Sequence, residues 1–229
     1  MDYQALVQEL ASLGTAQNRK VYTRHGVGEN QYGISLANLR KLQKQIKRDH
    51  TLATQLWASG NHDCRVLATM IADPSLADDN LLESWASDLN NYVITDAFSG
   101  LASQTALARE KAESWCKSDD EWVGRTGWLL VAHLAMKDSQ LTDSYFEECL
   151  ETIKEEIHSR QNRVKDAMNS ALIAIGIRNS QLEHLALAAA RRIGKVEVDH
   201  GETGCQTPDA AEYIRKTLAR RNQKNALTS

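Results

Sequence analysis

Proline, cysteine and long apolar runs are scarce in this 229-residue sequence, and each shortage excludes a class of protein. It has two prolines and no sustained apolar–polar alternation, so β-strands are not expected. The four cysteines form no CxxC pair, which argues against a zinc cluster or a disulfide scaffold. No window approaches about 18 uninterrupted apolar residues, and the first residues do not resemble a signal peptide. We therefore expect a cytoplasmic protein with no membrane span, no metal and no cofactor.

The sequence also lacks an excess of positive charge. It carries 27 lysines and arginines against 30 aspartates and glutamates, a net charge of -3. There is consequently no global attraction to nucleic acid, and any DNA binding must rest on a local basic surface. The proportions of hydrophobic residues (42%) and charged residues (25%) are ordinary for a globular protein.

Apolar residues recur at helical spacing along most of the chain. Leu81, Leu82, Trp85 and Leu89 form one such stripe. Two serines, each followed three residues later by a glutamate, have the spacing of capping boxes and predict helix starts: Ser118 with Glu121, and Ser180 with Glu183. The sequence therefore predicts about a dozen helices joined by short turns.

Similar helical segments recur after polar turns: NHDCRVLATMIAD from Asn61, NNYVITDAFSGLA from Asn90, DEWVGRTGWLLVAHLA from Asp120 and QNRVKDAMNSALIAIG from Gln161. Their early polar residues are separated by 31, 29 and 38 positions, close to the period of two-helix repeats: Arg65, Asp96, Arg125 and Arg163. We predict an all-α fold, an α-solenoid of HEAT-like antiparallel helix pairs with a concave face. Residues 1–224 would form one domain, and 225–229 a short polar tail.

In such a stack, one polar residue per repeat would point into a common groove. Arg65, Asp96 and Arg125 are the candidates, with Arg163 or Lys165 at the next repeat. The alternative is that each bonds to the turn of a neighbouring repeat, because incompletely exposed charges usually need a partner. For any single member of the row the second interpretation is favoured.

Two clusters of cations are further candidates for contact with phosphate. The helix expected at 35–49 carries Arg40, Lys41, Lys44, Lys47 and Arg48 beside an apolar stripe. These cations are compatible with contact to a phosphate backbone and also with a solvated outer face of the helix, and the sequence leaves both interpretations open. The second cluster closes the chain: Arg215, Lys216, Arg220, Arg221 and Lys224. A polar cap on the last repeat is the favoured interpretation there, with DNA contact as the alternative.

The longest stretch outside the helical pattern begins at Val196. His200, Glu202 and Cys205 in this stretch match no standard zinc spacing, so we expect a loop that packs against the last repeat and binds no metal.

Three ordered segments resemble the AlkD-like DNA alkylation repair family of HEAT-like repeat proteins. They are YGISLANLRKLQKQIKRD (32–49), LWASGNHDCRVLATMIADP (56–74) and EWVGRTGWLLVAHLA (121–135). The resemblance covers most of the chain from about residue 20. It implies an α-solenoid that grips duplex DNA on a basic concave face, and excision of N3- or N7-alkylated purines. For this chain we predict binding of duplex or branched DNA on the concave face.

The resemblance also implies a site. The family's W-x-x-x-D motif falls on Tyr92 to Asp96, its arginine on Arg125, and its second tryptophan on Ser170. The aspartate would stabilise the positive charge that develops on the sugar, the arginine would hold a phosphate, and the aromatic groups would stack. The remaining candidate DNA contacts are Arg65, Lys165, Arg163, Arg40, Lys44 and Lys47.

Neither tryptophan of the family site is present in this sequence. Tyr92 still offers an aromatic face, whereas Ser170 cannot stack. The sequence therefore predicts DNA binding and leaves glycosylase activity open. Asp96 is either the remnant catalytic acid or a structural partner of Arg125. The alternative function is a non-catalytic scaffold for protein partners.

Overall fold

The computed structural model describes the backbone of residues 2–228 and the side chains of residues 2–223, and all of its regular structure in that range is helical. No helix within these bounds is both long and apolar enough to cross a membrane. The side chains of Lys224 and of the expected tail lie outside the described residues, while the backbone of the last helix runs to Thr228.

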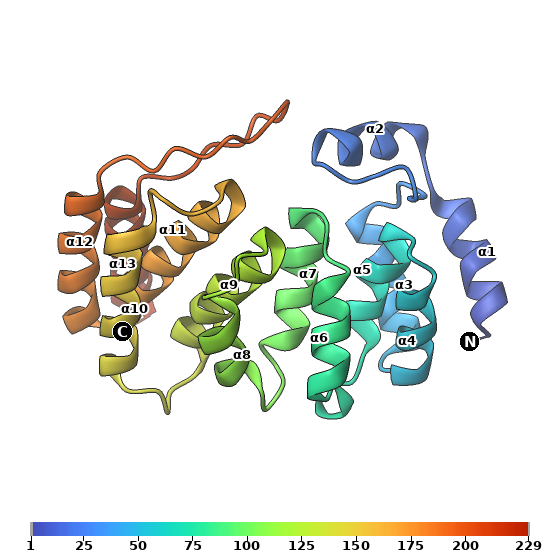
Figure 1. The fold of residues 1–229 in the computed structure, drawn as a ribbon, viewed down its shortest axis with the longest axis horizontal. Coiled ribbons are helices and arrows are strands. Elements are labelled where there is room, and N and C mark those ends of the chain that lie inside the picture. Colours follow the sequence, from blue (N-terminus) through green and yellow to red (C-terminus); the bar gives the residue numbers. More distant parts are fainter. Residues whose placement is uncertain (1, 229) are drawn as a thin grey trace. The chain divides into compact units, whose positions relative to one another are not determined.

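The chain divides into two compact units (Figure 1). One comprises residues 1–108 with 201–203, and the other 109–200 with 204–229. The helices up to the boundary are α1 (Tyr3–Leu13), α2 (Ala16–Arg24), α3 (Leu36–Ile46), α4 (His50–Ala58), α5 (His62–Ile71), the short 3₁₀ helix η1 (Pro74–Leu76), α6 (Asp79–Ser87) and α7 (Tyr92–Ala102). The later helices are α8 (Ala108–Trp115), α9 (Glu121–Lys137), α10 (Asp143–Glu156), α11 (Asn162–Gly176), α12 (Ser180–Ile193) and α13 (Ala210–Thr228).

Most helices of the first unit bury one apolar face, and α2 buries no residue fully. In α3, Leu39 and Leu42 are buried, and the cations occupy the opposite side of the helix. A short turn folds α4 back onto α5, and α5 packs in turn on α3 and α7. Contact between α5 and α7, the second helices of successive pairs, is the packing expected of a helical-repeat stack.

The second unit repeats this packing. Helix α11 lies between α9 and α13, while α10 packs on α12. Helix α11 is buried along most of its length, and at Gly176 a side chain would meet Ile214 of α13, with a Cβ placed 2.5 Å from its Cδ1. The second helices thus form one layer and the first helices another. Within each unit the predicted stack of antiparallel helix pairs is confirmed.

The predicted capping serines are wrong by one or two positions. Helix α9 is capped by Asp120, whose carboxylate accepts the N–H groups of Trp122 and Val123. Helix α12 is capped by Asn179, and Ser180 is its first helical residue. In both cases an Asp or Asn beside the serine supplies the acceptor.

Arginine side chains tie neighbouring turns together. Arg65 donates to the carbonyl oxygen atoms of Trp57 and Asp88, each at 3.2 Å, and pairs with the Asp88 carboxylate at 2.9 Å. Arg178 donates to the carbonyl oxygen atoms of Ala135 (2.9 Å) and Leu141 (3.0 Å). Carbonyl groups at helix ends lack intrahelical donors, so each guanidinium adds donors to acceptors at the ends of neighbouring helices and in the turns after them.

Asp63 fixes the loop between α2 and α3. Its side chain is buried at the start of α5, where it accepts backbone N–H groups from Tyr32 (2.6 Å), Gly33 (3.0 Å) and Ile34 (2.9 Å). The carbonyl group of Ile34 accepts the Tyr22 hydroxyl at 2.5 Å. One carboxylate therefore anchors the loop, and through Tyr22 it also anchors α2.

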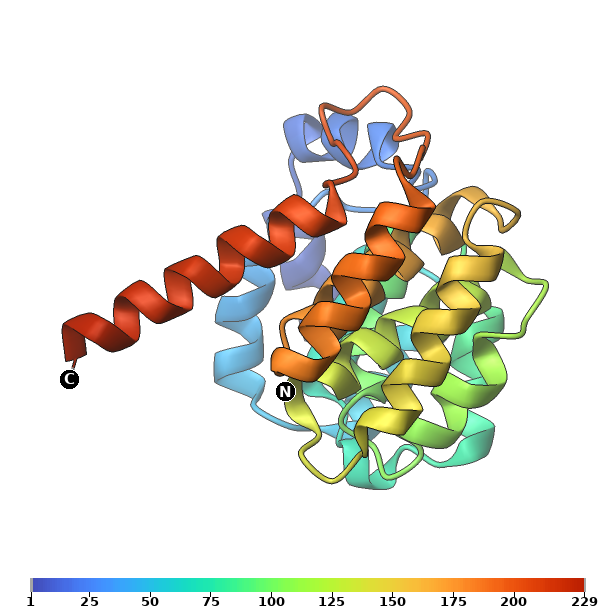
Figure 2. The same cartoon turned by 90° about the vertical axis from the view of Figure 1, so that its left-hand side faces the viewer.

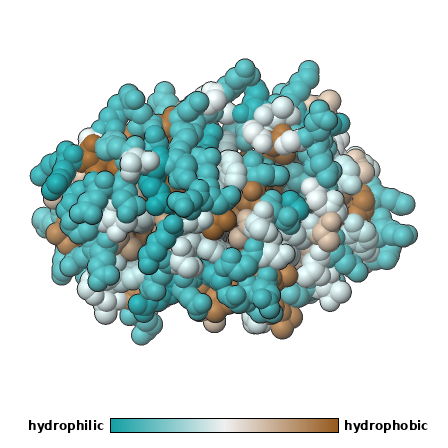
Figure 3. Space-filling model, viewed as in Figure 1, coloured by the Kyte–Doolittle hydropathy of each residue, from teal (hydrophilic) through white to brown (hydrophobic). Residues whose placement is uncertain are grey.

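Few large apolar side chains are exposed among the described residues. On the face shown in Figure 3, hydrophilic residues predominate and hydrophobic residues form small, separated spots. Single exposed apolar residues are normal for a globular protein. The described large ones are Leu36, Leu76, Met136, Leu185 and Tyr213.

Replacing Asp63 by Asn should lower the free energy of unfolding by about 3 kcal/mol, because an amide group offers fewer acceptor sites to three buried donors. Urea denaturation measures this change. Glu29→Gln is the matched control, since Glu29 is exposed in the same loop. Equal stability of the two variants would contradict the anchoring role of Asp63.

The protein should lose stability in mild acid because of His62. Burial lowers the pKa of His62 in the folded chain, so the unfolded chain takes up the proton at a higher pH. The resulting stabilisation is complete above a pH of about 6.5 and is lost as the pH falls toward the lower folded pKa. Urea midpoints on either side of that pH should differ less in His62→Phe than in the wild type. An unchanged difference would rule out His62 as the cause.

Candidate functional site

Tyr92 and Asp96 lie one turn apart on α7, so both project from the same side of the helix. The cap residue of this helix is Asn91, whose side chain accepts the N–H groups of Val93 and Ile94. Asp96 is exposed and Tyr92 is half-buried. The aromatic ring and the carboxylate expected at the family site therefore lie one turn apart on the same helix.

The hydroxyl group of Tyr92 is engaged with the end of α2. It hydrogen-bonds to Nδ1 of His25, and the two rings meet edge to face with centroids 5.7 Å apart. Tyr92 therefore connects the start of α7 to α2. The sequence had indicated only a stacking role for this ring, because the contact joins positions 67 residues apart.

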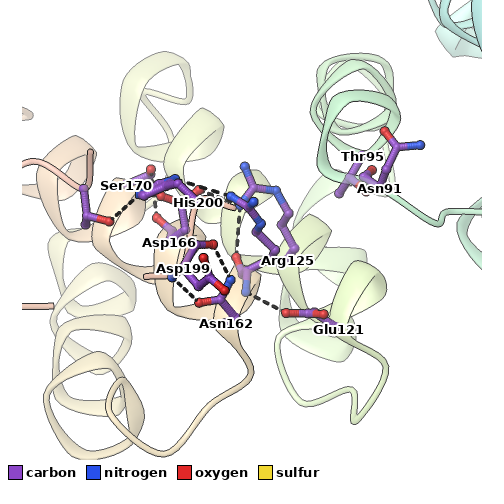
Figure 4. A network of polar contacts seen from close by, with 11 residues as sticks. Asn91, Thr95, Glu121, Arg125, Asn162, Asp166, Ser170, Asp199 and His200 are labelled. Carbon is purple, nitrogen blue, oxygen red and sulfur yellow. Dashed lines mark hydrogen bonds and ion pairs between the residues drawn. The ribbon is translucent and has the colours of Figure 1, made fainter. Parts of the chain in front are cut away.

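Arg125 is buried where α9 packs on α11. Its Nη1 atom donates to Asp166 at 2.7 Å and to the carbonyl oxygen of Arg163 at 3.0 Å (Figure 4). The N–H of Arg163 donates to the carboxylate of Glu121 at 2.7 Å. Only 5% of the Arg125 side chain is exposed, so its charge is neutralised inside the protein by Asp166.

Ser170 lies one turn after Asp166 on α11. Its hydroxyl group donates to the carbonyl oxygen of Asp166 at 3.0 Å, so the side chain folds back onto its own helix (Figure 4). No aromatic face is available at this position.

The loop between α12 and α13 is attached to α11 by polar side chains. Asn162 donates to the carbonyl oxygen of Asp199 (2.8 Å) and accepts its N–H (2.7 Å), as a β-strand neighbour would. His200 contacts Nη1 of Arg163 at 3.5 Å and the Thr207 hydroxyl at 2.9 Å (Figure 4). The loop thus packs on the repeat that carries Arg163. Lys165 and residues of the loop line a surface cavity at this contact.

Among the described residues, no group of three potential ligands could hold a metal ion. A separate cavity of about 590 Å³ is lined by residues of α8, α9 and α10, among them Cys116 and Cys149. Burial raises the pKa of the Cys149 thiol to about 12 and that of Cys116 well above its ordinary value. Both thiols are therefore protonated at neutral pH and unsuited to nucleophilic catalysis.

The expected cations fall into two groups. Arg65, Arg125 and Arg163 are bonded within their own units, as described above, and Lys165 is half-buried. The cations of α3 and its end are instead exposed to solvent: Arg40, Lys41, Lys44 and Lys47. The arginines of the row predicted from sequence spacing are thus bonded internally, whereas the separate cluster of cations on α3 is exposed.

Helix α2 carries a cationic surface that the sequence analysis missed. Arg19, Lys20 and Arg24 are exposed and form no ion pair in the described part of the chain. With a rotation of 100° per residue they span about 140° of the helix. The absence of any carboxylate between Glu9 and Glu29 was the sequence signal that would have revealed this surface.

The fold and these contacts define an all-α HEAT-like helical-repeat protein. The sequence profile of the family described as "DNA alkylation repair enzyme" matches residues 6–214. The chain belongs to this DNA alkylation repair family.

Relatives match along the whole chain. An uncharacterized protein of Listeria innocua is 28% identical over 96% of this chain and 99% of its own length. An uncharacterized protein of Listeria monocytogenes is 28% identical over 95% of this chain and 98% of its own length. A solved structure similar to this one has 30% sequence identity and a TM-score of 0.89, covering 96% of this chain and 95% of that one. It represents a family related to the HEAT-like repeat DNA glycosylases with affinity for branched DNA structures.

Arg125→Met and Asp166→Asn should each lower the free energy of unfolding by about 3 kcal/mol, because each removes one member of a largely buried ion pair. The double variant should lose less than the sum of the two changes. Urea denaturation of all four proteins measures this coupling, with the exposed Arg191→Met as control. If Arg125→Met is as stable as that control, Arg125 has no structural role.

Proposed function

We propose that this protein binds duplex and branched DNA through exposed cations, chiefly those of α3. The proposal rests on the contrast between cations that are bonded inside the protein and cations that are exposed to solvent. The chain belongs to a family described as DNA alkylation repair enzymes, so exposed cations suit contact with DNA. Arg65 and Arg125 are bonded internally, whereas Arg40, Lys41 and Lys44 face solvent on one side of α3. The wider expectation of a grip along a concave face stays a prediction.

Helix α3 has the geometry that a phosphate backbone requires. Arg40, Lys41 and Lys44 span about 100° of the helix surface, opposite buried Leu39 and Leu42. The α3 sequence contains no carboxylate, so no internal anion neutralises this face. Each phosphate neutralised by such a cation releases counterions, which makes binding favourable and dependent on salt.

Base excision has less support than binding. Asp96 is exposed on α7 and has the residue type needed to stabilise a sugar cation. Two features oppose excision: the Tyr92 hydroxyl is bonded to His25, and Ser170 has no ring to stack on a base or sugar. We therefore propose a DNA-binding protein in which binding does not depend on base release.

DNA binding should weaken as salt rises, and Lys41→Gln/Lys44→Gln should weaken it further at a fixed salt concentration. Each lost phosphate contact should reduce the slope of log K against log salt by about 0.9. Fluorescence anisotropy with a linear duplex and a four-way junction measures both effects. The matched control is Lys117→Gln/Lys137→Gln, which removes two exposed lysines elsewhere.

Equal losses in the two double variants would show that net charge alone, and not α3, controls binding. If the wild type binds neither DNA at low salt, the proposal fails and a scaffold for protein partners is favoured. Release of alkylated purines is measured on the same samples, with Asp96→Asn as the comparison. Release by the wild type that is abolished in Asp96→Asn, with unchanged binding, would assign catalysis to Asp96.

A further inference from the structure

Charge is distributed very unevenly along this nearly neutral chain. Residues 15–48 contain eight lysines and arginines and one glutamate, while residues 213–224 contain five lysines and arginines and no carboxylate. Residues 49–190, between them, contain eleven cations and 22 carboxylates. The net charge of -3 therefore conceals two basic segments separated by a strongly acidic one.

The few cations of the acidic segment are largely occupied within the protein. Arg65 and Arg178 donate to carbonyl groups of neighbouring turns, and Arg125 is paired with Asp166. Arg160 donates to the carbonyl groups of Cys116 and Ser118. These guanidinium groups are not available to phosphate, so the middle repeats offer DNA a mainly acidic surface.

The first basic surface, on α2, is rigidly held. Tyr22 fixes the inner side of the helix through its bond to Ile34 and its edge contact with the ring of His62. His25 fixes its end through Tyr92. Lys20 and Arg24 lie on the opposite side of the helix, and Arg19, which is about 60° from Tyr22, lies at the edge of the same exposed surface. No residue of α2 is fully buried, and its three exposed cations are the main feature of its surface.

The second basic surface is on α13, in the other unit. Ile214 is fully buried, and Arg221 donates to the carbonyl oxygen of Ile177 at 2.6 Å, which fixes the helix on α11. Arg215 and Arg220 are exposed and form no ion pair in the described structure. Figure 2 shows the second half of α13 extending away from α12. The described residues of α13 beyond Ile214 are mostly exposed, and its two unpaired arginines lie among them.

We infer that the protein holds branched DNA bivalently, one duplex arm on the cations of α2 and a second arm on those of α13. This inference rests on the proposed function. Each surface alone binds a duplex weakly and without sequence preference, through phosphate contacts. A branched molecule brings a second arm to the second surface at high effective concentration, so its affinity exceeds that of either arm alone. Branched DNA is then preferred without any contact specific to the branch point.

The test uses two charge-removing variants of the full chain and their combination. The α2 variant is Arg19→Gln/Lys20→Gln/Arg24→Gln, the α13 variant is Arg215→Gln/Arg220→Gln, and Lys117→Gln/Lys137→Gln is again the control. All retain Tyr22, Ile214 and Arg221, so both helices stay anchored, and circular dichroism and thermal melting verify the fold. The probes are a four-way junction and a linear duplex with the length of one arm.

Each variant should lower junction affinity about tenfold or more, toward the affinity for the single-arm duplex. Affinity for the single-arm duplex should fall less than about threefold, because the intact surface still binds it. The combined variant should lose the preference for the junction and keep only the weaker binding that the α3 cations give to both probes, and the control should change neither. This pattern requires two separate surfaces.

Two results would overturn the inference. If either variant weakens both probes by the same factor, one surface holds the DNA. If the α13 variant binds both probes as the wild type does, α13 is only a polar end to the repeat stack. A wild type that binds neither probe overturns the proposed function itself, whereas wild-type binding with either of those patterns overturns only the bivalent arrangement.

Discussion

The repeats of this protein depend on arginine side chains that donate to backbone carbonyl groups in neighbouring turns. Arg65, Arg160 and Arg178 each reach two such carbonyl groups, and Arg125 reaches one beside its ion pair with Asp166. Helix ends leave carbonyl groups without intrahelical donors, and a guanidinium group supplies several donors in one plane. Apolar packing brings the helices together, and these bonds fix how the turns meet.

This internal use of arginine has a direct consequence for function. A cation that donates hydrogen bonds to carbonyl groups, or pairs with a carboxylate, inside the protein is no longer available to phosphate. Arg65 and Arg125 therefore stabilise the fold, while the exposed cations of α3 and α2 lie on helices whose own sequences contain no carboxylate. The cations that we propose to contact DNA are thus displaced from the row of polar residues that repeats along the sequence.

The helix that carries Tyr92 and Asp96 is tied to one of these cationic helices. Where active relatives are expected to have tryptophan, Tyr92 supplies a hydroxyl group that bonds to His25 at the end of α2. The ring thereby helps to position α2. At Ser170 the side chain folds onto its own helix and leaves no platform for a base. Both replacements agree with our proposal that DNA binding by this protein does not depend on base release.

The sequence by itself determined the all-α class, the paired helices and the family, because apolar periodicity and recurring segments are local properties of the chain. It also contained the segregation of charge, visible in the carboxylate-free segment around Arg19. Only the tertiary structure decided the partners of Arg65, Arg125, Asp63 and Tyr92. Those partners lie between 8 and 67 residues away along the chain, so helical periodicity carries no information about them. Whether a cation meets a carbonyl group or solvent depends on how the helices pack.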